Sequence, residues 1–252
     1  QFIDRLRELS GGKPTGFKLA IGHPWEWFAI AKAMKQTGIL PDFIVVDGGE
    51  GGTGAAPLEF TDHVGAPMRE ALLLVHNTLV GLDLRARIRI GAAGKIVTAF
   101  DIARTLALGA DWVNAARGFM FALGCIQSQS CHTDRCPTGI ATQDPNRQAA
   151  LDPDGKAVRV ANFHRNTLVA LKELLAAAGL RHPLEIGPEH IIRRVSSTEV
   201  RALAKLHHFV PQGQLLEAVP EHPVFQVFWD QARAESFSPP PKAAEMQASK
   251  QQ

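Results

Sequence analysis

The sequence predicts a parallel α/β fold, and three observations support that prediction. Short apolar runs alternate with longer amphipathic segments, and this strand-then-helix order occurs four times. One run, residues 43–46, is wholly apolar and ends at Asp47 and a group of glycines, as is typical of a strand buried on both faces. Of the 252 residues, 45% are hydrophobic and 21% are charged, which is enough apolar material for one sizeable core.

The elements before the glycines follow from periodicity and from helix-ending signals. Residues 2–10 have the apolar spacing of an amphipathic helix, and residues 16–21 that of a strand. The next helix is expected over residues 25–37, because Gly38 suits the left-handed position that ends a helix. The second strand is the apolar run 43–46.

After the glycines the alternation continues. Pro67 suits the first turn of a helix over residues 68–80, and Gly81 suits its end. A third strand is expected over residues 87–90, and a helix over residues 99–108 follows it.

The fourth strand, residues 112–115, precedes a long irregular stretch and then a helix over residues 158–178 with Gly179 as its cap. We expect a helical extension over residues 181–235 and a disordered tail over residues 236–252, where periodicity is lost. The expected core stripe of the long helix consists of Val160, Phe163, Leu168, Leu171 and Leu175.

Two architectures fit such a series of parallel units, a doubly wound sheet and a (β/α)8 barrel. Four units supply only half of the eight strands of a barrel, and the spacing of the elements does not decide between the two. Because Gln1 is not an initiator methionine and a helix follows it at once, we expect the sequence to begin inside a larger protein.

Charge and apolar run length argue against two classes of partner. The formal net charge is +2 and the basic residues are spread along the chain, so no nucleic-acid partner is expected. No apolar stretch reaches the roughly 18 to 20 residues that span a bilayer, and the first residues have no signal-peptide pattern. We therefore expect a cytoplasmic protein with no membrane segment in this part of the chain.

All three cysteines lie in one polar, turn-rich loop, at Cys125, Cys131 and Cys136. Three thiols cannot all pair among themselves, and cytosolic proteins rarely use disulfides, so metal binding or catalysis is the better interpretation. Buried cysteines that act as small hydrophobic residues would not be confined to such a loop.

Among metal centres, thiolates favour zinc, copper(I) or an iron–sulfur cluster. The Cys136-Pro137 pair is typical of the end of ferredoxin cluster motifs, which favours an iron–sulfur cluster. A structural zinc held also by His132 is the alternative, although His132 directly follows Cys131 and neighbouring residues seldom both reach one tetrahedral ion.

The glycine loop after the second strand has five glycines in residues 48–54. Gly49 to Gly54 match the dinucleotide-binding pattern G-x-G-x-x-G. This match is the only support for the hypothesis of a nicotinamide-dependent dehydrogenase. The pattern requires its third glycine to open a helix, whereas here Pro57 follows and no helix is expected before Pro67. We interpret the glycines as a flexible loop at the carboxyl end of a barrel strand, where backbone approaches a flat ligand.

Three features together resemble the synthase domain of the glutamate synthase family, from about residue 14 to about residue 180. They are the run Asp-Gly-Gly-Glu-Gly-Gly-Thr-Gly-Ala-Ala-Pro from Asp47, the spacing of the cysteines, and the run Cys-Pro-Thr-Gly-Ile-Ala-Thr-Gln-Asp-Pro from Cys136. The resemblance implies the carboxyl-terminal half of a (β/α)8 TIM barrel over residues 1–180, with the iron–sulfur loop at residues 125–145.

The resemblance also implies cofactors and a reaction. It implies bound FMN and a 3Fe–4S cluster on Cys125, Cys131 and Cys136. The reaction would be the reduction of 2-iminoglutarate, formed from 2-oxoglutarate and ammonia, to L-glutamate, with the cluster passing electrons to the flavin.

The resemblance places the phosphate of FMN in the loops after barrel strands seven and eight, which commonly bind phosphate. Small residues there let backbone N–H groups approach, and Lys95 and Arg117 supply charge, although such side chains taken alone are more often solvated. The cofactor contacts implied in these two loops are Ala93, Gly94, Lys95, Ala116 and Arg117. The glycine loop adds Glu50, Gly51 and Gly52 as further predicted FMN contacts.

Lys18 lies in an otherwise apolar strand, where a charge is costly unless it is paired. Its side chain either reaches solvent at the strand end or, as in similar barrels, lies by the flavin ring, where a cation stabilises the anionic reduced form. Lys18 is therefore the predicted catalytic residue and a further predicted FMN contact.

Departures from the family pattern leave the product and the partners open. The extra acidic insertion at Glu50 and the run Gly-His-Pro-Trp-Glu-Trp from Gly22 differ from the larger enzymes, and an N-methylglutamate synthase-like enzyme is one alternative. A zinc-stabilised binding module without catalysis is another. No cysteine remains for glutamine hydrolysis, so the expected partners are an amidotransferase, an electron-donor subunit and the missing amino-terminal half barrel, with 2-oxoglutarate and glutamate as small molecules.

Overall fold

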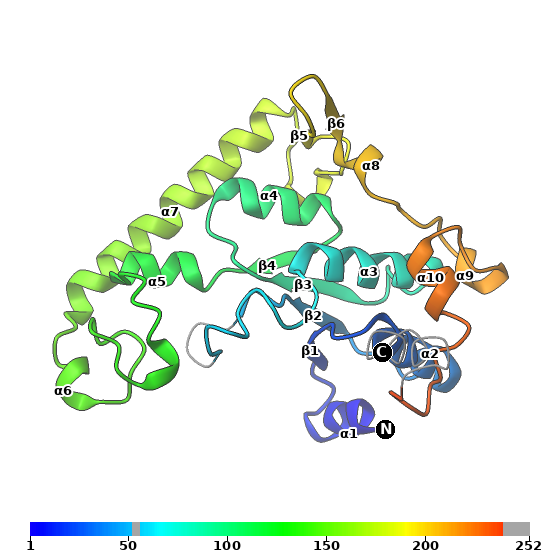
Figure 1. The fold of residues 1–252 in the computed structure, drawn as a ribbon, viewed down its shortest axis with the longest axis horizontal. Coiled ribbons are helices and arrows are strands. Elements are labelled where there is room, and N and C mark those ends of the chain that lie inside the picture. Colours follow the sequence, from blue (N-terminus) through cyan, green and yellow to red (C-terminus); the bar gives the residue numbers. More distant parts are fainter. Residues whose placement is uncertain (52–55, 239–252) are drawn as a thin grey trace, which may run out of the picture.

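The computed structural model describes residues 1–51 and 56–238, and Figure 1 shows their arrangement. The main sheet has four parallel strands that pair in the order β1-β2-β3-β4. These strands are β1 (Gly16–Ala20), β2 (Phe43–Asp47), β3 (Arg89–Ala93) and β4 (Trp112–Asn114).

The strand order decides between the two architectures. A doubly wound sheet reverses its strand order at a switch point, whereas a barrel places each new strand beside the previous one. Every strand of this sheet pairs in parallel with the next strand of the sequence, without a reversal. Right-handed crossovers in this order put the crossover helices on one face. The α/β fold is therefore that of half a (β/α)8 barrel.

The helices between the strands begin and end close to the expected positions. A helix follows each of the four strands, and further short helices follow the long helix α7, which runs along one side of the molecule (Figure 1). The helices are α1 (Phe2–Leu9), α2 (Pro24–Thr37), α3 (Met68–Gly81), α4 (Ala99–Ala107), α5 (Arg117–Leu123), α6 (Pro145–Gln148), α7 (Pro153–Ala177), α8 (Leu203–Leu206), α9 (Gln214–Glu217) and α10 (Pro223–Phe228).

The core lies between the sheet and its crossover helices. Ile44 and Val46 of β2 and Ile90 of β3 are fully buried on the face that α3 covers. Helices α2 and α3 also share a buried polar contact, because the indole Nε1 of Trp27 donates to Oγ1 of Thr78 at 2.9 Å.

On the opposite face of the sheet, aromatic rings lie against glycines. Gly16 pairs with Phe43, and a Cβ on Gly16 would come within 2.6 Å of the Phe43 ring. Gly91 pairs with Trp112, and a Cβ there would lie 2.5 Å from the indole. The rings of Phe43 and Trp112 meet edge to face at 5.9 Å. These glycines therefore make room for two large side chains on the inner face of the half barrel.

The segment after α7 packs back onto the first helices. The ring of Phe28 in α2 lies 4.9 Å from that of Phe225 and 5.2 Å from that of Trp229. Nζ of Lys32 donates to the carbonyl oxygen of Ala232 at 2.9 Å and lies over the Trp229 ring. No helix among the described residues has the length and apolar composition needed to cross a bilayer.

The structure corrects several predicted boundaries. Strand β3 starts and ends later than the predicted range 87–90, because Gly91 and Ala93 pair with strands on both sides. Gly81 does not cap α3 but lies within it, where a Cβ would come within 2.8 Å of Leu215.

Two further differences concern the carboxyl-terminal third. Helix α7 starts at Pro153, five residues before the predicted start at 158, because Asp152 accepts a hydrogen bond from the N–H of Gly155. Leu168 is exposed and is not part of the core stripe. The segment expected to be helical also contains an antiparallel hairpin of β5 (Ile192–Arg194) and β6 (Val200–Ala202). Most of the predicted tail, residues 239–252, lies outside the described residues.

Candidate active site

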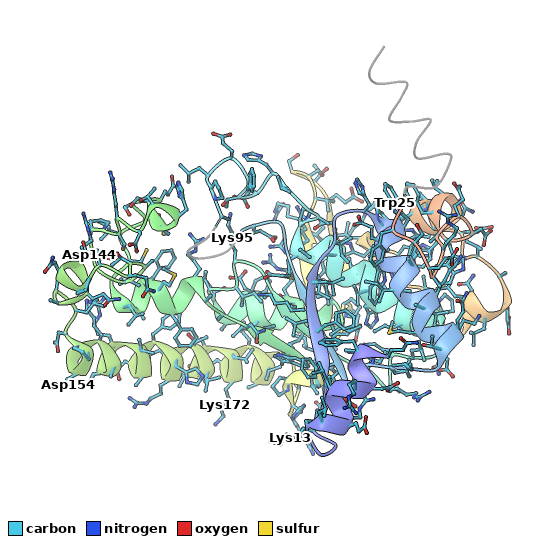
Figure 2. All side chains as sticks on the ribbon, turned by 90° about the horizontal axis from the view of Figure 1, so that it is seen from below. Lys13, Trp25, Lys95, Asp144, Asp154 and Lys172 are labelled. Atoms are coloured by element: carbon cyan, nitrogen blue, oxygen red, sulfur yellow. The ribbon has the colours of Figure 1, made fainter. Side chains whose placement is uncertain are left out.

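A cavity of about 190 Å³ opens at the carboxyl ends of the four parallel strands. Figure 2 shows Lys13, just before β1, and Lys95, just after β3, on opposite sides of the molecule, as expected for the two ends of a parallel sheet. The cavity is lined by Lys18, Asp47, Gly51, Ala93, Gly94, Lys95, Asn114, Ala115, Ala116 and Arg117. It thus brings together seven of the nine predicted cofactor contacts from four separate stretches of the chain.

Lys18 is the middle residue of β1, and its side chain lines the cavity with the ammonium group paired. Nζ of Lys18 is 2.6 Å from Oδ2 of Asp47, and the side chains are 58% and 31% exposed. The neighbouring strand positions explain the pair, because Ala20, two residues after Lys18 and on the same face, is the register partner of Asp47. Sequence analysis did not identify Asp47 as a site residue, although its place directly after a buried strand was a usable signal.

The turn after β3 is held in an unusual backbone conformation. Gly94 has φ of +155° and Lys95 has φ of +47°. A Cβ on Gly94 would lie 2.6 Å from Cβ of Met68, so only glycine fits. Nζ of Lys95 pairs with the carboxylate of Asp62, a residue whose role sequence analysis missed.

Arg117 begins α5 directly beside this turn. Its Nε is buried and has no hydrogen-bond partner among the described residues. A buried guanidinium nitrogen without a partner is costly, and such groups in native proteins usually meet a ligand or water. Ala115 and Ala116 add no large side chains to this wall of the cavity. The cavity is therefore lined by a guanidinium group whose Nε no described residue satisfies.

The predicted contacts from the glycine loop are only partly on the cavity. Gly51, with φ of +86°, lines it. Glu50 does not, because its Oε1 accepts the N–H of Met68 at the start of α3 and its Oε2 is buried without a partner among the described residues. Gly52 lies outside the described residues. The glycine at 49 approaches the protein's own chain, since a Cβ there would lie 2.6 Å from the carbonyl oxygen of Gly65.

The cysteine loop follows α5, so that Arg117 and Cys125 lie at the two ends of one short helix. The three thiols are free, with Cys125 and Cys131 partly exposed and Cys136 buried. Oδ1 of Asp134 organises the loop, because it accepts the hydroxyl of Thr142 at 3.0 Å and a backbone N–H at 2.6 Å. Asp134 is another residue that sequence analysis missed.

The environment of Cys136 favours a thiolate. Burial opposes ionisation, but the Thr138 hydroxyl, 3.3 Å from Sγ, and backbone N–H groups of Ala141, Thr138 and Ile140 lower the pKa of Cys136 to about 7. The thiolate is the form that binds metals. Among the described residues, no three His, Cys, Asp or Glu side chains converge as the ligands of a single metal ion. In an iron–sulfur cluster the cysteines bind different irons and need not converge in that way.

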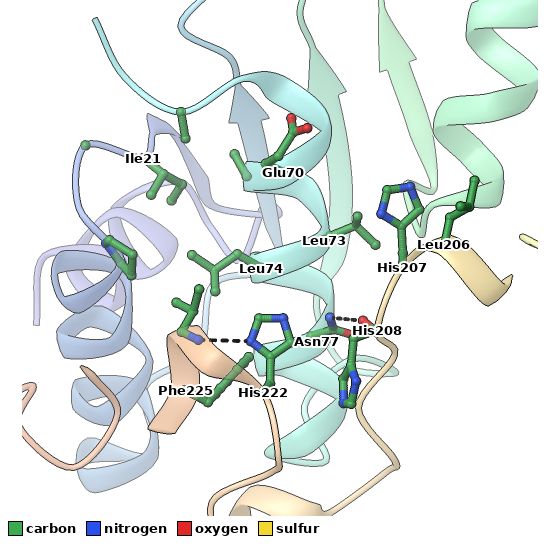
Figure 3. Close-up of a pocket in the computed structure, with 15 residues that line it drawn as sticks. Ile21, Glu70, Leu73, Leu74, Asn77, Leu206, His207, His208, His222 and Phe225 are labelled. Atoms are coloured by element: carbon green, nitrogen blue, oxygen red, sulfur yellow. Dashed lines mark hydrogen bonds between the residues drawn. The ribbon is translucent and has the colours of Figure 1, made fainter. Parts of the chain in front are cut away.

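A larger cavity, of about 410 Å³, lies between α3 and the carboxyl-terminal segment (Figure 3). It is mostly apolar, with Leu73 and Phe225 among its lining residues. The side chain of Asn77 is already used, since it donates to the carbonyl of His208 and accepts the N–H of Val210. Nδ1 of His222 accepts the N–H of Val224 at 3.2 Å. These polar groups hold the segment against α3 and do not converge on a ligand.

Comparison with known proteins gives a family and several relatives. A family model described as a conserved region in glutamate synthase matches residues 1–181. Glutamate synthase large subunit-like protein YerD of Bacillus subtilis is 44% identical over 210 residues, which are 83% of this chain and 40% of that protein. Archaeal glutamate synthase (NADPH) of Methanocaldococcus jannaschii is 40% identical over 181 residues, which are 71% of this chain and 35% of that protein.

The chain spans only 40% and 35% of the lengths of these two relatives. Among solved structures, the recombinant flavin-binding domain of flavocytochrome b2 from baker's yeast is 16% identical, with a TM-score of 0.43 over 87% of this chain and 44% of that one. An overlap at that level adds nothing to the fold that the strand order already defines.

Proposed function

Because the chain belongs to the glutamate synthase family, we propose that its cavity at the strand ends binds FMN and takes part in reducing 2-iminoglutarate to L-glutamate. The observation that carries the proposal is the gathering of Lys18, Lys95 and Arg117 around one cavity at the carboxyl end of a half barrel. In barrels of this architecture, active sites lie at that end.

The residues present fit the phosphate of FMN. The Arg117 guanidinium lines the cavity, its Nε has no partner among the described residues, and Gly94 brings backbone without a side chain to the cavity wall. Lys95 adds a second cation, at present paired with Asp62. In this proposal the phosphate exchanges partners with Asp62 or shares the ammonium with it.

Lys18 and Asp47 would act at the ring end of the cofactor and on the substrate. FMN, when bound, supplies two electrons and a proton to the C=N bond of 2-iminoglutarate, and solvent or a side chain supplies the second proton. The ammonium of Lys18 stabilises negative charge on the reduced ring or on a substrate carboxylate, and Asp47 holds it at 2.6 Å. Asn114, which lines the same cavity, adds an amide that both donates and accepts.

The cysteines would hold the iron–sulfur cluster that delivers electrons. The lowered pKa of Cys136 supports this proposal, because cluster ligands are thiolates. We assign the cluster to Cys125, Cys131 and Cys136 and its type to 3Fe–4S, as the family resemblance implies.

The proposed site needs partners. In the described chain β1 and β4 are the edge strands of the four-stranded sheet, whereas a closed barrel has eight strands. Four further strands would complete the barrel and the flavin site. An amidotransferase, or ammonia from solution, would supply the nitrogen, and an electron donor would reduce the cluster.

The experiment that tests the flavin site uses the full-length protein that carries this chain. Arg117→Met removes a cation whose side chain makes no hydrogen bond or ion pair among the described residues, so folding should be unaffected. We expect FMN affinity to fall by tenfold or more, because a charge-assisted bond to phosphate is worth about 1.5–3 kcal/mol. Flavin absorbance after dialysis and a binding titration of the apoprotein measure the change.

The matched control is Arg159→Met, at an exposed position of α7 outside the cavity lining, which should leave FMN affinity unchanged. Gly94→Asp is a weaker test than the sequence alone suggests, because a Cβ there meets Met68 and the variant can lose flavin by misfolding. Equal FMN affinity in Arg117→Met and wild type would contradict the proposed phosphate site.

The cluster is tested separately by chemical analysis. Anaerobically purified protein should contain about three irons per chain together with acid-labile sulfide. Cys131→Ser should lose them, since a hydroxyl replaces a thiolate poorly as a ligand of iron. Stoichiometric zinc without sulfide would instead support the zinc-stabilised alternative.

A further inference from the structure

Three arginines from three separate elements line a further cavity, which lies beside the β5–β6 hairpin. Arg69 comes from α3, Arg104 from α4 and Arg193 from β5, and the cavity has a volume of about 210 Å³. His207 also lines it, and the cavity lies apart from Lys18 and Arg117. The fold therefore gathers basic groups at a place that the proposed flavin site does not use.

The carboxylates near these arginines do not neutralise them fully. Arg104 pairs with Asp101 at 2.6 Å, but that carboxylate also accepts the hydroxyl and N–H of Thr98 in the cap of α4. Among the described residues, no ion pair within 4.0 Å involves the side chain of Arg69 or of Arg193. Glu70 is the remaining carboxylate on the lining. Three guanidinium groups thus face two carboxylates, one of them shared with a helix cap.

Arg104 has a hydrogen-bond donor that no described residue satisfies. Its Nε is buried without a hydrogen-bond partner among the described residues, although its guanidinium already binds Asp101 and lies over the ring of Phe100. Burial and, to a smaller extent, the nearby Arg69 lower the pKa of Arg104, as expected where like charges lie close together. An anion between the guanidinium groups would offset their repulsion and accept hydrogen bonds from them.

The rest of the lining is apolar. Phe100, Leu108, Ile191, Ile192 and Leu203 form the other walls of the cavity. An inorganic ion would leave these side chains against water, whereas an organic anion would cover them with its body. The two kinds of wall suit a molecule with one charged head and one apolar part.

We propose that this cavity binds a small organic anion, with a carboxylate or phosphate head held by Arg69, Arg104 and Arg193 and a short apolar body against Phe100 and Leu203. Guanidinium groups suit both heads because their planar donors match two oxygens at once. The hairpin supplies Arg193, so a bound anion would tie β5 to α3 and α4.

The test is calorimetric titration of the full-length protein, saturated with FMN, with four probes. Phenyl phosphate and benzoate carry an anionic head and an apolar body, inorganic phosphate carries only the charge, and benzyl alcohol only the apolar body. We expect at least one of the first two to bind with a Kd in the millimolar range or below, at least tenfold more tightly than inorganic phosphate and benzyl alcohol. The tighter of the two identifies the head group.

Two substitutions on one strand distinguish binding in the cavity from a general effect of removing positive charge. Arg193→Gln removes a cavity-lining cation, and we expect it to weaken binding about tenfold, equal to about 1.4 kcal/mol. Arg194→Gln is the matched control, since adjacent strand residues point to opposite faces and Arg194 instead donates to the carbonyl of Ser197. It should change the Kd less than about twofold. Arg69→Gln, on α3, repeats the test should the hairpin variant fold poorly.

The proposal is overturned if neither organic anion binds, if inorganic phosphate binds as tightly as both, or if the two hairpin variants weaken binding equally. The result is independent of the flavin proposal. In Arg117→Met the probes should bind as in wild type whether or not FMN is retained, so failure of one site does not imply failure of the other.

Discussion

At the scale of single residues, the ion pair of Lys18 and Asp47 sets how much charge the proposed flavin would meet. The ammonium is more than half exposed and only 2.6 Å from a carboxylate. Solvent and the counter-charge both weaken its field. The effect of Lys18 on a cofactor therefore depends on Asp47 as much as on Lys18.

Opposite changes to this pair should move the flavin reduction potential in opposite directions. Lys18→Met removes the cation that favours the reduced anion and should lower the potential, while Asp47→Asn removes the counter-charge and should raise it. We expect tens of millivolts in each case, because a tenfold change in a two-electron equilibrium is about 30 mV. Redox titration of the full-length protein at full FMN occupancy measures both. Two shifts of the same sign would remove the pair from the mechanism.

His76 makes the stability depend on pH. Burial, with a smaller effect of Arg85, lowers the pKa of His76 to about 4 from 6.5. The unfolded chain then binds a proton that the folded chain does not, so the free energy of unfolding falls as the pH drops from about 6.5 to 4. The full contribution is about 3 kcal/mol. Burial lowers the pKa of His207 and His222 as well, with the same sign.

Urea unfolding at pH values of about 7 and about 4.5 measures this dependence. His76→Gln should reduce the loss of unfolding free energy between these pH values, whereas His63→Gln, at an exposed position, should not. An equal loss in wild type and His76→Gln would mean that other groups cause the acid sensitivity.

At the scale of elements, the contact between α2 and α3 includes one buried hydrogen bond to a hydroxyl. Thr78→Val keeps the shape of a fully buried side chain but leaves the indole N–H of Trp27 without its acceptor. We expect a loss of about 1–3 kcal/mol of unfolding free energy. Thr105→Val is the matched control, because Thr105 is 1% exposed and its hydroxyl also bonds the carbonyl four residues earlier, but it accepts no indole. Chemical denaturation of both variants compares them, and equal losses would show that the indole contact adds nothing.

The elements also show what the sequence predicts and what it leaves open. Gly38 ends α2 in the left-handed conformation because that signal is local. The end of β3 was predicted too early because Gly91 belongs to the strand through its pairing with Val45 and Trp112, which no local pattern indicates. Gly81 was predicted to end the helix. A glycine is needed there because Leu215, which is distant in the sequence, leaves no room for a Cβ.

In the candidate site, too, local signals were predicted correctly and contacts between distant parts of the sequence were not. Ala93, Gly94, Lys95, Ala116 and Arg117 follow parallel strands, and the strand-end rule brings them to one cavity. The carboxylates were missed, because the pairing of Asp62 with Lys95 depends on how the loop after β2 returns. No local pattern encodes such a return, and none indicates that Glu50 accepts the N–H of Met68 at the start of α3.

At the scale of the whole molecule, the segment after α7 and the half barrel share one core. Phe225 is fully buried against Phe28, and Phe225→Ala should cost about 3–5 kcal/mol of unfolding free energy. Phe237→Ala, at a side chain that is 60% exposed, should cost less than about 0.5 kcal/mol. Thermal unfolding of both variants tests this, and a small effect of Phe225→Ala would mean that the segment is only loosely attached.

The same attachment determines the order in which the chain can finish folding on the ribosome. Each strand pairs with the next one to be synthesised, so the sheet can grow while the chain emerges. The outer face of α2 is covered only later, because Lys32 and Trp25 donate hydrogen bonds to carbonyl groups 200 and 212 residues further along the chain. Until those residues leave the exit tunnel, Trp25 and Phe28 remain uncovered. The nascent chain would therefore present an aromatic surface to chaperones from the emergence of α2 until residues 232 and 237 have emerged.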